Sequence, residues 1–115
     1  MAALDLHIKG ADRIREVFAR VRNGDARVAD PYTEDGVLIF GSGNSRVQGR
    51  EEIRVFYQRA FDTIRPQPQV LTVLEQPPLY VAILDVPTDD VRHRAVDLFE
   101  VDDEGIRSLE IFSHG

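Results

Sequence analysis

Two carboxylic acids and a histidine in the last quarter of the chain have a spacing that suits proton transfer. Asp97 belongs to one strand-like run and Glu110 to the next, on either side of a turn at residues 102–105, and His114 follows the second run. Because side chains alternate between the faces of a strand, pairing of these runs predicts Asp97 close to Glu110 or Phe112. Burial and a neighbouring carboxylate both raise a carboxyl pKa, so one acid would donate a proton while the other accepts it. The imidazole of His114 would move protons near neutral pH.

The rest of the candidate site is aromatic and apolar. Tyr57 would be an additional hydrogen-bond donor, so the predicted catalytic groups are Asp97, Glu110, His114 and Tyr57. A ligand among them would contact Val17, Tyr32, Phe40, Phe61, His93, Phe99 and Phe112. Such a lining suits a small and mostly apolar molecule.

Each of these groups also has a purely structural interpretation. Glu110 could pair with an arginine, and Asp97 could bond to Tyr57 and hold the fold together. The two tyrosines could pack in the core with satisfied hydroxyls. His114, next to the last residue, could lie in a loose terminus. Both interpretations stay open at this point.

Metal and cofactor chemistry finds little support in the residue types. The histidines and the two carboxylates match no compact metal-ligand motif, so we expect no metal ion. The sequence has no cysteine, which removes thiolate catalysis, disulfides and cysteine-ligated clusters. Lys9 is the only lysine, and its place near the N-terminus argues against a Schiff-base cofactor. We therefore expect a site without a cofactor.

Length and composition predict one globular domain over residues 1–115. The chain is 43% hydrophobic and 30% charged, with a net charge of −6. No basic patch is present, so we expect no nucleic-acid partner. The apolar runs are too short to cross a membrane, and no signal peptide precedes the first helix. These features, with the absence of cysteine, favour a cytoplasmic protein.

The periodicity of apolar residues predicts three helices in the N-terminal half. Residues 1–10 have no clear period and read as a flexible lead-in. A helix over residues 11–23 carries apolar side chains at helical spacing and ends before Gly24. Asp25 would cap a second, shorter helix that ends near Tyr32, and the third covers residues 50–64 with one apolar face.

Strand-like runs make up most of the remaining sequence. They cover residues 37–40, 46–48, 70–75, 79–86, 91–101 and 106–113. Strands of this length must bend to enclose a small core. We therefore predict an α+β domain in which a cone-shaped, curved antiparallel β-sheet wraps around the three helices and leaves a central pocket.

Three stretches of the chain resemble the nuclear transport factor 2-like superfamily, which includes steroid Δ-isomerases and SnoaL-like polyketide cyclases. They are residues 23–25, residues 32–37 continuing through 47–57, and residues 95–99 continuing through 102–106 to the C-terminus. The resemblance implies the cone-shaped fold and a homodimer formed through the sheet. The superfamily hosts isomerases, cyclases, hydrolases, dehydratases and proteins without catalytic activity, so the resemblance is more specific for fold than for function.

Carrying the steroid-isomerase positions onto this chain implies an incomplete catalytic set. The catalytic base falls at Phe40, and the oxyanion-hole tyrosine of the first helix falls at Val17, or at Glu16 with a shift of one residue. The second oxyanion donor, a protonated aspartate, is present as Asp97. The supporting tyrosines and the aromatic residue at the end of the last strand match Tyr32, Tyr57 and His114. Because that mechanism needs both a base and an oxyanion hole, we do not expect steroid isomerisation in that form.

Two hypotheses of function follow. The first is a cofactor-free enzyme of SnoaL-like isomerase, cyclase or dehydratase type that acts on a small apolar molecule. The second is a non-catalytic ligand-binding or partner module, which the missing base favours. An epoxide-hydrolase-like Asp–Arg–Asp site lacks its arginine, since Arg92 and Arg94 lie on the other face of their strand from Asp97. The apolar residues expected on the dimer face are Val96, Leu98, Leu109 and Ile111.

Overall fold

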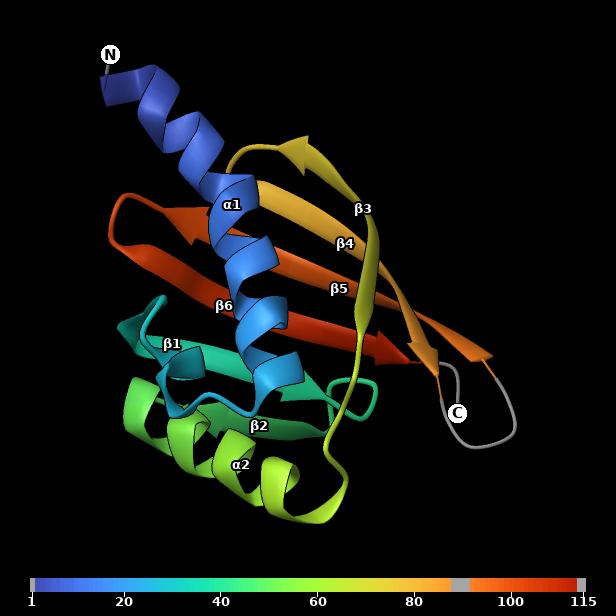
Figure 1. Cartoon of the computed structure of the whole chain (residues 1–115). Coiled ribbons are helices and arrows are strands. Elements are labelled where there is room, and N and C mark those ends of the chain that lie inside the picture. Colours follow the sequence, from blue (N-terminus) through green and yellow to red (C-terminus); the bar gives the residue numbers. More distant parts are fainter. Residues whose placement is uncertain (1, 88–91, 114–115) are drawn as a thin grey trace.

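The computed structural model describes residues 2–87 and 92–113, with side chains for residues 10–87 and 93–112. The helices pack beside one large sheet (Figure 1). In chain order the elements are α1 (Ala2–Asn23), the 3₁₀ helix η1 (Ala26–Ala29), β1 (Tyr32–Phe40), β2 (Ser45–Gln48), α2 (Arg50–Thr63), β3 (Gln69–Gln76), β4 (Leu79–Pro87), β5 (Arg92–Asp102) and β6 (Gly105–Ser113). The predicted α+β class is confirmed.

The sheet has the order β2-β1-β6-β5-β4-β3. Strands β3 to β6 form the predicted antiparallel series, and β1 pairs antiparallel with β2. Strand β1, however, runs parallel to β6. The sheet is therefore mixed, and the expectation of an antiparallel sheet was wrong at this one junction. The parallel pair joins the first strand to the last. These strands are far apart in the sequence, so no turn motif between them predicts the pairing.

The helices differ from the expected three. Asp25 does cap the segment after α1, since its carboxylate accepts a hydrogen bond from the Arg27 backbone N–H at 2.9 Å. That segment is only a four-residue 3₁₀ helix, because Pro31 and the start of β1 follow almost at once. Helix α1 contacts β3 and β4, whereas α2 contacts β1 and β2, and both contact η1.

Helix α1 begins at Ala2, so the expected lead-in over residues 1–10 was wrong. Gly10 is buried inside the helix, where the Tyr80 ring of β4 lies directly against it. A Cβ atom at Gly10 would lie 2.2 Å from the Tyr80 hydroxyl oxygen. The glycine therefore permits a close approach of α1 to the sheet and does not end a flexible segment.

The core lies between the helices and the inner face of the sheet. Helix α1 contributes Ile14, Val17, Phe18 and Val21, and α2 contributes Ile53 and Tyr57. The Phe18 and Phe99 rings meet edge to face with centroids 5.9 Å apart. Strand β5 turns its alternate residues Ala95, Asp97, Phe99 and Val101 toward this core. Neither helix is long and apolar enough to span a membrane within the described residues.

A β-bulge sets the register between the last two strands. Val101 pairs with Ile106, but the next pair is Glu100 with Ser108, so Arg107 is an extra residue in β6. The Arg107 guanidinium pairs with Asp102, with Asp35 at 3.3 Å and with Glu104 at 3.2 Å. Beyond the bulge, every side chain of β6 lies on the opposite face from the one that simple pairing across the turn predicts.

This register corrects the expected dimer face. Val96 and Leu98 do lie on the outer face of β5, opposite Phe112 and Glu110. Leu109 and Ile111 instead pair with the inward-facing Phe99 and Asp97, and Leu109 is fully buried in the core.

Candidate functional site

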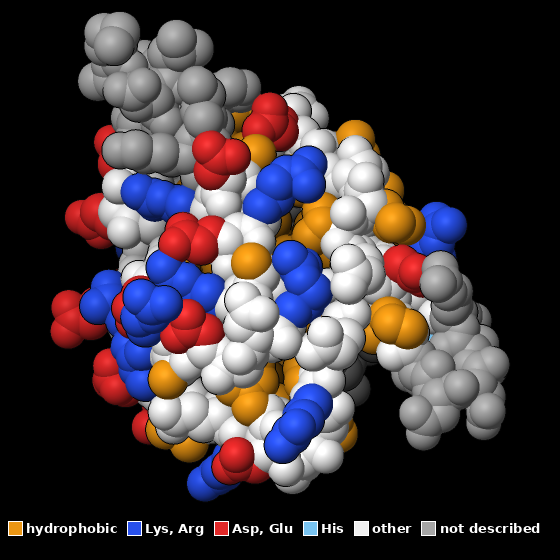
Figure 2. All heavy atoms as spheres, in the orientation of Figure 1, with side chains coloured by type: hydrophobic (Ala, Val, Ile, Leu, Met, Phe, Trp, Pro, Cys, Tyr) orange, Lys and Arg blue, Asp and Glu red, His pale blue; other side chains and the backbone are white. Residues whose placement is uncertain are grey.

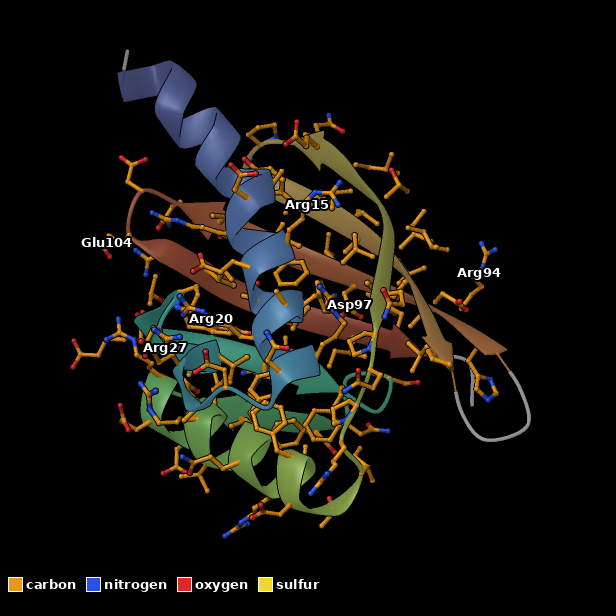
Figure 3. All side chains as sticks on the ribbon, in the orientation of Figure 1. Arg15, Arg20, Arg27, Arg94, Asp97 and Glu104 are labelled. Carbon is orange, nitrogen blue, oxygen red and sulfur yellow. The ribbon has the colours of Figure 1, made fainter. Side chains whose placement is uncertain are left out.

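Asp97 is a buried carboxylic acid in the middle of the sheet. Its cross-strand neighbours are Ala82 of β4 and Ile111 of β6, so aliphatic groups flank it on both sides. Only 4% of the residue is exposed, and its Oδ1 atom has no hydrogen-bond partner among the described residues. Burial raises the pKa of Asp97 to about 7. Figure 3 shows this side chain on the helix side of the sheet, while Arg94 of the same strand points away.

Two tyrosines lie near this carboxyl group. The Tyr32 hydroxyl, at the start of β1, is 3.4 Å from the Tyr57 hydroxyl of α2, and both side chains are buried. Burial raises the pKa of Tyr57 to about 12 and that of Tyr32 well above its usual range. The charge of Asp97 raises the pKa of both hydroxyls further, which places its carboxylate within electrostatic reach of the pair. Both phenols are therefore neutral hydrogen-bond donors at physiological pH.

A row of aromatic rings continues from the tyrosine pair along α2. The centroid of the Phe56 ring lies 5.3 Å from that of Phe40 and 5.7 Å from that of Tyr57. Tyr57 and Phe61 are one helical turn apart, with centroids separated by 6.0 Å. Phe40, Phe56 and Phe61 are each half-buried. The inner face is thus apolar, and the rings on either side of the buried Tyr57 are partly exposed.

A cavity of about 320 Å³ opens where α1 and α2 end. Its lining residues are Val21, Arg22, Asn23, Gly24, Phe61, Arg65 and Gln67. Of these, only Phe61 was predicted from the sequence. The helix-stop signals at Gly24 and Pro66 were available in the sequence, but they do not reveal that both helices end at the same place. Asp97 is not among the lining residues.

The described part of the chain holds no cluster of three or more histidine, aspartate or glutamate residues that could bind a metal ion. Asp97 has apolar partners on the neighbouring strands, and its charge reaches the Tyr32 and Tyr57 hydroxyls. Neutral phenols and one isolated acid are suited to hydrogen bonding more than to holding a divalent cation.

The sequence matches no family model and no curated protein. The fold, in contrast, has many counterparts among solved structures. A nuclear transport factor 2-like (NTF2-like) protein of unknown function from Cytophaga hutchinsonii superposes with a TM-score of 0.76, at 13% identity over 91% of this chain and 89% of that one. A provisionally named SnoaL-like polyketide cyclase from Jannaschia sp. gives 0.79, at 18% identity over 94% and 87%. A provisionally named ketosteroid isomerase from Kribbella flavida gives 0.83, at 19% identity over 95% and 80%.

The chain has the nuclear transport factor 2-like fold. At these identities the likeness shows the fold alone, and the resemblance expected from the sequence is confirmed at that level. Within the NTF2-like fold of this chain, Asp97 and Tyr57 occupy the inner side of the sheet, where helices and strands face one another.

The predicted pairing of Asp97 with Glu110 on one face was wrong. In this NTF2-like sheet Asp97 lies opposite Ile111, while Glu110 lies opposite Leu98 on the outer face. Phe112 also lies outside, opposite Val96, and it is 47% exposed. The bulge at Arg107 is the physical reason, because one extra residue exchanges the two faces of the strand.

The other candidate residues divide between core, surface and the undescribed terminus. Val17 and Phe99 are completely buried on the inner side of the NTF2-like fold. Phe40, at the position implied for the catalytic base, packs against Phe56. His93 is exposed near the start of β5, where it pairs with Val86. His114 lies outside the described residues.

Proposed function

We propose that this domain binds a small, mostly apolar molecule on the inner face of the sheet and donates a hydrogen bond to it from protonated Asp97. The observation that supports this most directly is the buried Oδ1 atom of Asp97, which has no partner among the described residues. A buried polar atom without a hydrogen bond is costly in a folded protein and calls for a compensating role. A ligand with a carbonyl or phenolic oxygen would supply the missing partner.

The protonation state of Asp97 would determine its role. With a pKa of about 7, the group is a neutral acid in mildly acidic solution and a carboxylate in mildly basic solution. As an acid it donates a hydrogen bond and stabilises charge that develops on a ligand oxygen. As a carboxylate it accepts a proton, as a general base does. Tyr57 would add a second neutral donor near the same place.

An isomerase or cyclase type of chemistry, without cofactor, fits these groups. The provisional names of two similar structures, a polyketide cyclase and a ketosteroid isomerase, favour the same type. The reaction would rely on Asp97 and Tyr57, since Glu110 lies on the other face of the sheet. The ligand would approach at the Phe40 end of the aromatic row, where Phe40 and Phe56 are half-buried.

The second candidate is a ligand-binding module without catalysis. Phe40 supports it, because this aromatic residue stands where the resemblance implies the base and packs against Phe56. A single acid with aliphatic cross-strand neighbours can hold a ligand oxygen without moving protons through a cycle. The two candidates share the same binding step and differ in turnover.

A thermal-shift screen with phenols, steroids and aromatic polyketide-like molecules tests the shared step. A true ligand should raise Tm for the native protein and for Glu34→Gln, which changes an exposed carboxylate of β1. The same ligand should raise Tm much less for Asp97→Asn. Equal shifts in all three proteins would contradict a role for Asp97. Product formation from the ligand would then separate the enzyme from the binding module.

A second copy of the chain would cover the outer face of the sheet. Apolar side chains cross this face from β3 to β6, namely Leu74, Leu79, Val81, Ile83, Val96, Leu98 and Phe112. Arg94, Glu100 and Glu110 lie among them and offer charges of both signs to a symmetric partner. A continuous apolar patch of this kind is typical of an interaction surface, and we propose a homodimer through it.

A further inference from the structure

We infer that the cavity between the ends of α1 and α2 binds a small aromatic carboxylate, separately from the Asp97 site. Two arginines, Arg22 and Arg65, contribute to its lining, and no acidic residue is among the described residues that line it. Val21 and Phe61 supply the apolar part of the wall. The arrangement pairs positive charge with an aromatic surface, which suits a ring that carries a negative group.

The charge of the two cavity arginines is not neutralised by the protein. On the side of the molecule where the helices lie, basic and acidic side chains are interspersed (Figure 2). Neighbouring arginines have acidic partners, such as Arg54 with Asp30 at 3.0 Å and Arg27 with Asp25 at 2.8 Å. Among the described residues, Arg22 and Arg65 take part in no ion pair. Two cavity-lining arginines without an acidic partner in the described part of the chain make this surface locally positive, and this would attract an anion.

Hydrogen bonds hold Arg22 in place and leave several of its N–H donors unused. Its Nη1 atom donates to the Pro68 carbonyl oxygen at 3.1 Å, and the Gln67 side-chain amide donates back to the Arg22 carbonyl oxygen at 2.9 Å. These reciprocal bonds tie the end of α1 to the segment before β3. A guanidinium has five N–H donors, so most of those on Arg22 remain for a ligand oxygen.

Arg65 has an unusual backbone conformation. Its φ angle of 44° is left-handed, at the position after a helix where glycine is usual. The Arg65 backbone N–H closes the helix end by donating to the Ala60 carbonyl oxygen at 3.2 Å. An arginine in this conformation costs stability relative to glycine, and strain of this kind is concentrated at functional sites. Anion binding by the Arg65 guanidinium would explain why arginine occupies this position despite that cost.

The volume limits the ligand. A cavity of about 320 Å³ is near the lower end of the range for small-molecule sites, so it accommodates one or two fused rings with a carboxylate. The planar carboxylate matches the fork of a guanidinium, and the ring would lie against Phe61. We use 1-naphthoate as the probe and 1-naphthamide as the uncharged probe of the same shape.

The test is a titration followed by amide NMR spectra of the whole chain. We expect saturable shifts at Gly24, Phe61 and Gln67 with naphthoate at millimolar concentration, and little change with naphthamide. Arg65→Gly should weaken naphthoate binding by about tenfold, the size of one charge-assisted hydrogen bond. The same variant should raise the Tm of the free protein, because glycine relieves the left-handed strain, so lost binding could not be blamed on misfolding.

Two control variants make the outcome decisive. Arg59→Gln removes an exposed arginine of α2 that does not line the cavity, and it should leave naphthoate binding unchanged. Asp97→Asn should also leave naphthoate binding unchanged. The cavity inference and the proposed function can therefore be tested independently. The inference would be overturned by equal shifts at Gly24, Phe61 and Gln67 with naphthamide, by undiminished binding of naphthoate to Arg65→Gly, or by naphthoate shifts that centre on Asp97.

Discussion

Asp97 of β5 lies directly opposite Ile111 of β6, so its carboxyl group meets an aliphatic side chain across the strands and not a second acid. This pairing explains both its isolation and its raised pKa. Burial alone shifts the group to about 7, without a neighbouring carboxylate. Chemistry on this face of the sheet would therefore depend on one acid and two phenols.

Replacing Asp97 with asparagine should change how stability depends on pH. The carboxyl pKa is about 7 in the folded chain and 3.8 for an unperturbed aspartate, so the native protein loses stability as pH rises from about 4 to about 7. The shift of about three pKa units corresponds to about 4 kcal/mol at most. Asp97→Asn has no such pH dependence, and above about pH 7 it should be more stable than the native protein by roughly 1–3 kcal/mol, since its amide is also buried.

Urea denaturation of both proteins at several pH values measures this difference. Glu34→Gln is the control, since it removes an exposed carboxylate from β1 of the same sheet. We expect the control to follow the native curve. A constant difference between Asp97→Asn and the native protein from acid to neutral pH would show that Asp97 ionises normally.

The phenols should respond to the charge of Asp97. Burial and this charge together raise the pKa of Tyr57 to about 12 and raise the pKa of Tyr32 well above its usual range. Asp97→Asn removes the charge but keeps the shape, so the ultraviolet titration of these tyrosines should move to lower pH. Tyr57→Phe identifies the contribution of that residue to the curve. An identical titration in native and Asp97→Asn proteins would place the carboxylate out of reach of both hydroxyls.

Gly10→Ala should destabilise the chain although alanine favours helices. The added Cβ would lie 2.2 Å from the Tyr80 hydroxyl oxygen, and overpacking of this kind costs about 1–3 kcal/mol. The exposed position Asp12 in the same helix is the control, because Asp12→Ala gains helix propensity without a clash. Thermal unfolding should show a lower Tm only for Gly10→Ala. A higher Tm for that variant would mean that α1 does not approach β4 at this point.

The outer face of the sheet should control the oligomeric state. Val96→Asp places a charge in the middle of the apolar patch, where it would be desolvated in a dimer, so the dimer should dissociate. Glu34→Gln, at an exposed position of β1, is the control. Analytical ultracentrifugation should give a dimer for the native and control proteins and a monomer for Val96→Asp. A monomeric native protein would contradict the proposed interface.

Local patterns in the sequence were sufficient for much of the fold. The apolar face of residues 50–64 predicted α2 within a residue of its observed range, and the four C-terminal strands followed from runs of β-branched residues broken by turns. Asp97 was correctly placed on the buried face of its strand. These features depend on neighbours in sequence, which is why periodicity reveals them.

Most of the errors depend on contacts between distant residues, whereas the shortness of η1 has a local cause in Pro31 and the start of β1. The bulge that reverses the faces of β6 brings Arg107 to Asp35, which lies in another strand, and to Asp102 and Glu104. The helical role of Gly10 depends on Tyr80, far along the chain. The cavity likewise depends on the ends of α1 and α2 meeting in space. Spacing in a single sequence contains no signal for such contacts.

The pKa of Asp97 itself, measured by carbon NMR of its labelled side-chain carboxyl group, is the sharpest test of the proposed hydrogen-bond donor. We expect a pKa of about 7 in the free protein, and a further rise when a carbonyl-bearing ligand from the screen accepts a hydrogen bond from the protonated acid. A pKa of about 4, unchanged by any ligand that binds, would overturn the proposal, because Asp97 would then be an ordinary carboxylate with no role as a donor.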